Sequence, residues 1–180
     1  MSWCSTFVAL SKNTHERATF DCGEDALNTF IQTQAVRHMS AGVSKTMLLP
    51  AALPVTNGKY PICAFYTIAP GSISRDLLPR EMARKLPHYP VPVFLLAQLA
   101  VHVGYQGQGL GKITLIKALE NLAKINAHMR AYAVIVDCVN LDAERFYLKY
   151  NFQTLCLHEG RQRLFIPMKT VKRLFGADAP

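Results

Sequence analysis

Residues 93–112 pass from a continuous apolar stretch through a cluster of glycines into a segment with helical periodicity. The apolar stretch, Val93–Val103, suits a strand that lies in the middle of a sheet. Gly104–Gly111 then permits a tight turn, and apolar residues recur at helical spacing from Ile113 to Leu122. A strand that leads through such a turn into a helix presents backbone N–H groups and the positive end of the helix dipole to an anion. The segment therefore predicts a phosphate-binding turn in a mixed α/β fold.

The spacing of the glycines excludes two common phosphate-binding motifs. A P-loop, G-x-x-x-x-G-K-[ST], needs Gly where Gln106 stands and Ser or Thr where Ile113 stands. The dinucleotide-binding motif G-x-G-x-x-G fails as well, because the glycines here are spaced G-x-G-x-G. The motif that is present, Gln106–Gly111, reads Q-x-x-G-x-G. Taken alone, it leaves open a structural turn that binds no ligand.

The other apolar patterns and turn residues predict one sheet with flanking helices. Strands are expected at residues 6–10, 44–49, 62–68, 133–139, 154–157 and 163–168, and helices at about 21–39, after Gly111 and after Asn140, which can cap the last of them. A short basic helix is expected in an insertion at 75–89, and a basic tail after the last strand. Half of the 180 residues are apolar, which is enough to bury one core. We therefore expect a single α/β (α+β) domain that spans residues 1–180.

The amino-acid composition indicates which class of partner the protein binds and in which cellular compartment it is found. Twenty Lys and Arg against twelve Asp and Glu give a net charge of +8, which favours polyanionic partners. The five cysteines are widely spaced and contain no C-x-x-C pair, which argues against a disulfide framework or a metal site and for a reducing cytosol. The longest apolar run, Val91–Val103, is too short to span a bilayer, and the N-terminus lacks a signal-peptide pattern. We expect a soluble cytoplasmic protein without a bound metal.

A second motif follows about thirty residues after the glycine-rich turn. Asn140–Tyr147 reads N-x-x-A-x-x-[FL]-Y and comes directly after a buried strand. Together with Q-x-x-G-x-G it resembles the acetyl-CoA-binding core of the GNAT N-acetyltransferases. The family usually has Gly before the Phe that follows this motif; here Asn151 precedes Phe152, and Asn tolerates a positive φ better than most residues. The resemblance implies the GNAT fold, a mixed central sheet with flanking helices that is splayed near its fourth and fifth strands, and acetyl-CoA as the cofactor.

The resemblance also implies a role for each matched residue. Asn140 contacts the pantetheine arm, and Tyr147 lies beside the thioester sulfur, where its phenol can protonate the departing thiolate as the general acid. Backbone N–H groups of a bulged strand around Leu99–Val101 can hold pantetheine and stabilise the oxyanion. The residues expected to bind acetyl-CoA are Leu99, Ala100, Val101, Gln106, Gly107, Gln108, Gly109, Leu110, Gly111, Lys112, Asn140 and Phe146. A core aromatic on an amphipathic helix is the structural alternative for Tyr147.

No general base stands out in the sequence. His102 lies beside the glycine-rich turn, but a lone histidine at a strand end is more often a packing or surface residue, so it is left out of the catalytic set. An α-amine with a pKa of about 8 is partly neutral at cellular pH, so acetyl transfer to such an amine does not require a strong base.

Segments outside the two motifs resemble a narrower group, the GNAT toxins of bacterial toxin–antitoxin pairs. The matching segments, which with the motifs cover nearly the whole chain, are Phe20–Gly23, Ser44–Thr46, Ala64–Ile68, Leu86–Val93 and Leu164–Met168. In those toxins the strand before the turn usually reads L-[GA]-R-L-A-V-D, whereas this chain has Gln98 in place of the Arg and His102 in place of the Asp. The resemblance implies acetylation of the α-amine of aminoacyl-tRNA, which blocks translation. It also implies a homodimer and a cognate ribbon-helix-helix antitoxin as partner.

Two groups of basic residues are candidates for contact with a tRNA substrate, whose phosphates would dominate the affinity. They are Arg75, Arg80, Arg84 and Lys85 in the insertion, and Arg161, Arg163, Lys169, Lys172 and Arg173 near the C-terminus. Two other functions stay open: a GNAT enzyme that acetylates a small amine or a protein amino group, and a non-catalytic basic RNA-binding module. The intact Gln106–Gly111 and Tyr147 argue against the module, and the few acidic residues give little sign of a pocket for a polyamine.

Overall fold

The computed structural model describes residues 2–176, which fall into two compact units. The first unit is formed by Met1–Ala69 and Gln98–Ala118, and the second by Pro70–Ala97 and Leu119–Pro180. Two long strands and one long helix contribute residues to both units. Each unit is built around its own cluster of buried apolar side chains.

The first unit joins antiparallel strands to a helical segment. Its strands are β1 (Val8–Ala9), β2 (His15–Glu16), β3 (Lys45–Pro50), the start of β4 (Tyr60–Ile73) and the end of β5 (Val91–Val101). β3 is antiparallel to β1 and β4, and the hydroxyls of Thr46 and Thr67 lie 2.7 Å apart in the interior. The helical segment consists of α1 (Asp25–Thr29), a π-helical stretch (Phe30–Gln34) and α2 (Ala35–Ser40). Phe30 and Ile31 are buried in a core that includes Phe20 and Phe65.

The second unit holds the remaining strands and several short helices. Its further strands are β6 (Ala133–Asp137), β7 (Gln153–His158) and β8 (Arg161–Pro167). β6 is parallel to β5 and antiparallel to β8, which is in turn antiparallel to β7. Its helices are η2 (Arg75–Leu77), α3 (Arg80–Ala83), the end of α4 (Leu110–Asn126), α5 (Leu141–Lys149) and α6 (Met168–Leu174). Val93, Ile135 and Phe165 lie in its core.

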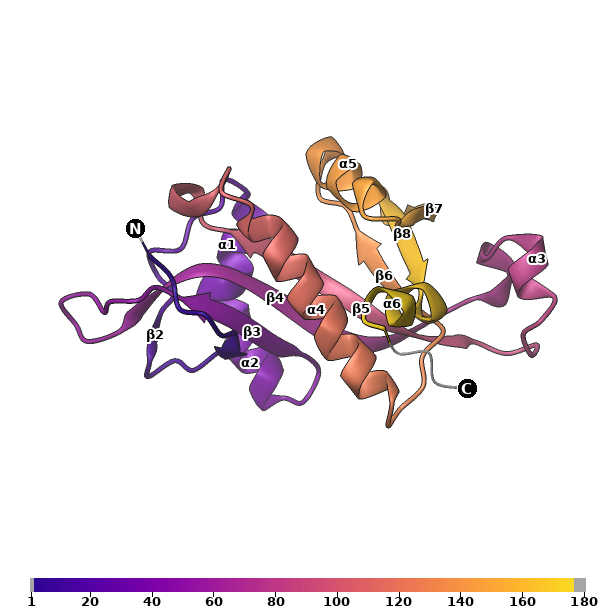
Figure 1. Cartoon of the computed structure of the whole chain (residues 1–180), viewed down its shortest axis with the longest axis horizontal. Helices are drawn as coiled ribbons and strands as arrows, with labels where there is room; N and C mark the ends of the chain where they lie inside the picture. Colours follow the sequence, from indigo (N-terminus) through magenta and orange to yellow (C-terminus); the bar gives the residue numbers. More distant parts are fainter. Residues whose placement is uncertain (1, 177–180) are drawn as a thin grey trace. The chain divides into compact units, whose positions relative to one another are not determined.

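Strand pairing confirms the mixed sheet that the sequence predicts. Hydrogen-bonded neighbours follow the order β1-β3-β4-β5-β6-β8-β7, with β2 paired to β4 (Figure 1). The ladder between β5 and β6, the fourth and fifth strands of the sequence-based prediction, covers Val93–Leu95, although β5 continues to Val101.

Most of the remaining elements lie close to their predicted positions, and the C-terminal segment is the clearest difference. The predicted helix at about 21–39 begins at Asp25 and ends at Ser40. The segment expected to be a basic tail forms α6 instead, because Met168 and Val171 lie three positions apart and are both buried. Within the described residues, every helix falls short of the length or apolar character that crossing a membrane requires.

Candidate active site

The glycine-rich turn joins the end of β5 to the start of α4 within the first unit. After a short 3₁₀ turn, η3 (Val103–Tyr105), the backbone passes through Gly107 with a φ of 73° and Gly109 with a φ of 80°. These left-handed conformations are costly for residues with a Cβ. Among the described residues, and apart from each glycine and its two chain neighbours, no heavy atom lies within 4 Å of the place a Cβ would take at either glycine. The space in front of the turn is therefore open, and backbone conformation is what requires glycine here.

The first turn of α4 offers main-chain donors next to this open space. The N–H groups at the start of an α-helix have no intrahelical acceptor and carry the positive end of its dipole. Leu110 is almost fully buried, so any contact that it makes with a ligand comes from its main chain, whereas Lys112 beside it is exposed. The turn therefore fits a pyrophosphate, as the sequence motif predicts.

The Gln106 side chain ties the turn to neighbouring backbone segments by hydrogen bonds. Its Nε2 donates hydrogen bonds of 2.9 Å to the carbonyl oxygens of Val101 and Cys22. Gln108 and Val103 contribute further hydrogen bonds, to the carbonyls of Gly104 and Asp21. The side-chain nitrogen of Gln106 therefore fixes the backbone of the turn.

His102 and Tyr105 pack beneath the turn. The Nδ1 of His102 accepts a hydrogen bond of 3.0 Å from the backbone N–H of Gly104 and so caps the 3₁₀ turn. The imidazole lies edge-on to Phe20 and Tyr105. Burial raises the pKa of Tyr105 to about 12, and its hydroxyl is hydrogen-bonded to the Cys63 thiol. His102 thus has the packing role that kept it out of the predicted catalytic set.

The strand before the turn combines buried side chains with the backbone groups assigned to acetyl-CoA. Ala100 is buried in the core of the first unit, and Leu99 and Val101 are half-buried. All three lie beyond the β5–β6 ladder, which ends at Leu95. A contact of Ala100 with a ligand would therefore come from its backbone.

Tyr147, the predicted general acid, lies on α5 in the second unit. Asn140 caps this helix as predicted: its Oδ1 accepts a hydrogen bond of 2.8 Å from the N–H of Ala143. Tyr147 is buried, and its ring packs against those of Phe146 and Phe152. Burial raises the pKa of its phenol, so the hydroxyl keeps its proton well into the alkaline range.

The turn after α5 places Phe152 against Tyr147. Asn151 adopts a φ of 69°, the conformation for which the family usually has Gly. The Phe152 N–H then donates to the Tyr147 carbonyl, so the chain folds back onto the end of the helix. Cys138, which the sequence analysis did not single out, is buried directly after β6, and burial raises the pKa of its thiol to about 11.

Some of the basic residues predicted to contact tRNA are buried or half-buried, and others are exposed. Arg163 was expected to contact nucleic acid, but it is buried and forms a bidentate ion pair with Asp137, so its guanidinium is not exposed for a phosphate. Arg75 is half-buried and donates to the Leu86 carbonyl. The exposed members of the predicted set are Arg80, Arg84, Lys85, Arg161, Lys169 and Arg173.

Comparison with known proteins finds acetyltransferases that are similar to this chain. Residues 81–152 match the Acetyltransferase (GNAT) family. A tRNA-acetylating toxin of Mycobacterium tuberculosis is 29% identical over 161 residues, which cover 88% of this chain and 89% of that protein. A solved structure of AtaT complexed with acetyl-methionyl-tRNAfMet is 27% identical, covers 94% of this chain and 98% of the other, and superposes with a TM-score of 0.83. AtaTR bound with AcCoA is 27% identical, with 94% and 97% coverage and a TM-score of 0.80. Residues 81–152 of this chain are therefore similar to the GNAT acetyltransferases.

Proposed function

We propose that this protein transfers an acetyl group from acetyl-CoA to the α-amine of aminoacyl-tRNA and thereby blocks translation. The observation that carries the proposal is the turn at Gly107 and Gly109, whose left-handed backbone and open front fit the pyrophosphate of acetyl-CoA at the start of α4. The choice of aminoacyl-tRNA as acceptor is supported by the likeness, over most of the chain, to a protein named as a tRNA-acetylating toxin.

In the proposed reaction, the neutral α-amine attacks the thioester carbonyl carbon. A C–N bond forms and the C–S bond breaks, the nitrogen releases one proton to solvent, and the CoA thiolate takes a proton from Tyr147. Tyr147 then regains a proton from solvent, which restores the enzyme. Backbone N–H groups at Leu99–Val101 would stabilise the oxyanion. Asn140, Phe146 and Lys112 complete the proposed acetyl-CoA set together with the other residues of the turn.

The proposal extends to the assembly in which the enzyme acts. Residues 1–180 would form one catalytic domain, and two copies would form a homodimer in the cytoplasm. A cognate antitoxin of the ribbon-helix-helix class would neutralise the toxin. These points rest on the resemblance to the GNAT toxins.

Mass spectrometry of aminoacyl-tRNA after incubation with the protein and acetyl-CoA tests the proposal. We expect the mass of one acetyl group on the aminoacyl moiety with the natural protein and, over the same short incubation, about 10²–10⁴-fold slower acetylation with the Tyr147→Phe variant. Acetylation of small amines with unmodified aminoacyl-tRNA would instead identify a different GNAT enzyme. Translation that is inhibited equally by Tyr147→Phe would point to RNA binding without catalysis.

A further inference from the structure

A cavity lies entirely within the second unit, and its lining residues include neither the glycine-rich turn nor Tyr147. It has a volume of about 750 Å³. Its walls come from α3 and the loop after it, from the end of α4 and the loop that leads into β6, and from α6. This volume lies within the range of pockets that hold small molecules or single nucleotides.

The charge of this pocket is strongly one-sided. Its cationic residues are Lys85, Arg130, Lys169, Lys172 and Arg173, and they come from three separate elements. The one carboxylate among the lining residues is Glu81, whose side chain is 87% exposed and forms an ion pair of 3.3 Å with Arg84. A pocket lined mainly by positive charge attracts anions. An anion with several charges suits it best, because such an anion can contact cations on more than one wall at once.

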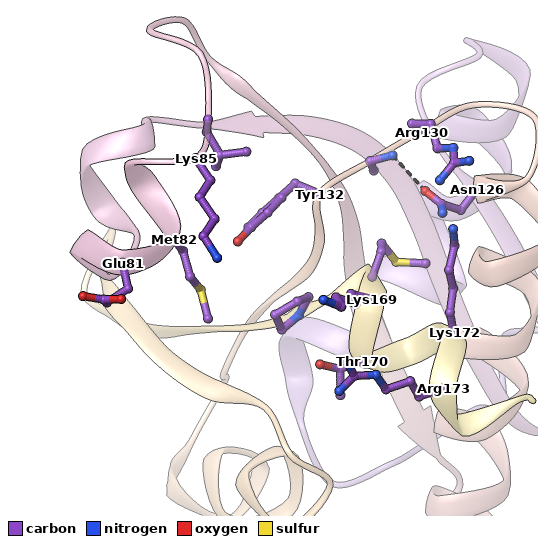
Figure 2. Close-up of a pocket in the computed structure, with 14 residues that line it drawn as sticks. Glu81, Met82, Lys85, Asn126, Arg130, Tyr132, Lys169, Thr170, Lys172 and Arg173 are labelled. Carbon is purple, nitrogen blue, oxygen red and sulfur yellow. Dashed lines mark hydrogen bonds between the residues drawn. The ribbon is translucent and has the colours of Figure 1, made fainter. Parts of the chain in front are cut away.

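Tyr132 gives the pocket an aromatic surface between these cations. Figure 2 shows the side chains of Lys85 and Tyr132 directed into the same space, with Arg130 and Lys172 on the side of Asn126. The Tyr132 backbone is fixed, since its N–H donates to Pro92 and its carbonyl accepts from Met168. Burial raises the pKa of its phenol, so the ring stays neutral and does not repel an anion.

The loop that carries Arg130 is held in place as well. Asn126 is almost fully buried, and its Oδ1 accepts a hydrogen bond of 2.9 Å from the Ala131 N–H. This hydrogen bond fixes the backbone next to Arg130, which is exposed and lines the pocket. Several cations around an aromatic face are the arrangement with which proteins bind a nucleic-acid backbone and stack one of its bases.

We propose that this pocket binds the phosphodiester backbone of the tRNA, with one base against Tyr132. The proposal rests on the proposed function, because it takes the tRNA substrate as the source of the phosphates. Of the basic residues near the C-terminus that the sequence offers as candidates, it keeps Lys169 and Lys172, adds Arg130, and leaves out Arg163, which is buried in an ion pair.

The experiment measures binding of fluorescently labelled tRNA that carries no amino acid. The full chain is used without acetyl-CoA, over a series of KCl concentrations. The pocket variant is Lys169→Glu/Lys172→Glu. The charge-matched control is Lys12→Glu/Lys45→Glu, which changes two exposed lysines of the first unit. We expect the pocket variant to weaken binding by about tenfold or more and to lower the salt slope by roughly 1.4–1.8, the value for two lost phosphate contacts. The control should show much smaller changes in both.

A second pair of variants tests the aromatic contact. Tyr132→Phe keeps the ring and should bind tRNA like the natural protein, whereas Tyr132→Leu should weaken binding by roughly tenfold through loss of stacking. Thermal unfolding of each variant checks that the second unit is intact, and Lys169→Gln/Lys172→Gln replaces the glutamate variant if that protein unfolds.

Three results would overturn the proposal: an unchanged affinity in the pocket variant, an equal loss in the control, or unchanged tRNA binding together with a changed oligomeric state. The last would assign the pocket to a protein interface. Because uncharged tRNA is the probe, binding through the pocket without acetyl transfer would contradict the proposed function alone. If the pocket variant acetylates aminoacyl-tRNA with an unaltered KM, the proposed tRNA-binding role of the pocket is wrong, while the proposed function stands.

Discussion

Arg163 and Asp137 face each other on β8 and β6 and are joined by two hydrogen bonds of 2.7 Å, from Nε to Oδ1 and from Nη2 to Oδ2. The two residues are directly paired in the strand register, so the bidentate geometry needs no backbone adjustment. The hydrogen bond to Asp137 raises the pKa of the Arg163 guanidinium. This ion pair fixes the end of the β6–β8 ladder, next to the Cys138 that follows β6.

Breaking this ion pair should destabilise the fold while leaving tRNA affinity nearly unchanged. Asp137→Asn keeps the size of the side chain but leaves a mostly buried guanidinium without its counter-charge, at a cost of about 1–3 kcal/mol. Urea unfolding measures this loss. Arg161→Ala, two residues away on the same strand and exposed, is the control and should change the free energy of unfolding little. A large loss of tRNA affinity in a folded Asp137→Asn protein would contradict the structural role of the pair.

Gly109→Ala should impair acetyl-CoA binding more than it impairs folding. A left-handed φ costs alanine about 1–2 kcal/mol, and the added methyl projects into the open space in front of the turn. Gly58 is a matched control, because its φ is 78° and a Cβ there would also meet nothing within 4 Å. Both variants should lose similar stability, but only Gly109→Ala should weaken acetyl-CoA binding, by roughly tenfold for one lost charge-assisted contact. Equal acetyl-CoA affinities by calorimetry would remove the turn from the proposed site.

The local features of the site were predictable because short-range chemistry decides them. Asn140 is followed by a helical pattern, and an asparagine side chain caps such a helix wherever it lies. Asn151 adopts the left-handed conformation for a similarly local reason. The glycine spacing predicted the turn, since Gly107 and Gly109 are the residues that need a positive φ.

Features that depend on strand register or on distant segments were not predictable. Arg163 looked exposed because it lies among other basic residues, but four consecutive residues of β8, 163–166, are buried, so alternation along the strand gave no signal. The cationic pocket draws on α3, the loop after α4 and α6, which are far apart in the sequence. A signal for α6 was present in the spacing of Met168 and Val171, although the density of basic residues obscured it.

Cys138 should make stability depend on pH in the alkaline range. Burial, reinforced by the carboxylates of Glu144 and Asp137, raises the pKa of its thiol from 9.0 to about 11. Below pH 9 the thiol is protonated in both states, and its contribution is fully present. Between pH 9 and 11 the unfolded chain releases the proton first, so the free energy of unfolding falls as pH rises.

Cys138→Ala should flatten this fall by on the order of 2 kcal/mol. Urea unfolding from neutral pH to pH 11 measures it, with Cys156→Ala on the half-buried β7 as the control. Parallel pH profiles for the natural protein and Cys138→Ala would show that the buried thiol is not the responsible group.

Tyr147→Phe should fold and bind acetyl-CoA like the natural protein but lose about 10²–10⁴-fold in kcat, the usual contribution of a general acid. The ring contacts with Phe146 and Phe152 do not involve the hydroxyl, so packing is preserved. Because burial raises the pKa of this phenol, the natural enzyme should show no loss of kcat from Tyr147 ionisation as pH rises through 10.0, the ordinary pKa of a tyrosine.

Tyr150→Phe is the control: it removes a hydroxyl from the next tyrosine along the chain, at the end of the same helix, and should keep full activity. Single-turnover kinetics with aminoacyl-tRNA compares the three proteins, and a natural rate in Tyr147→Phe would mean that solvent or another side chain protonates the thiolate.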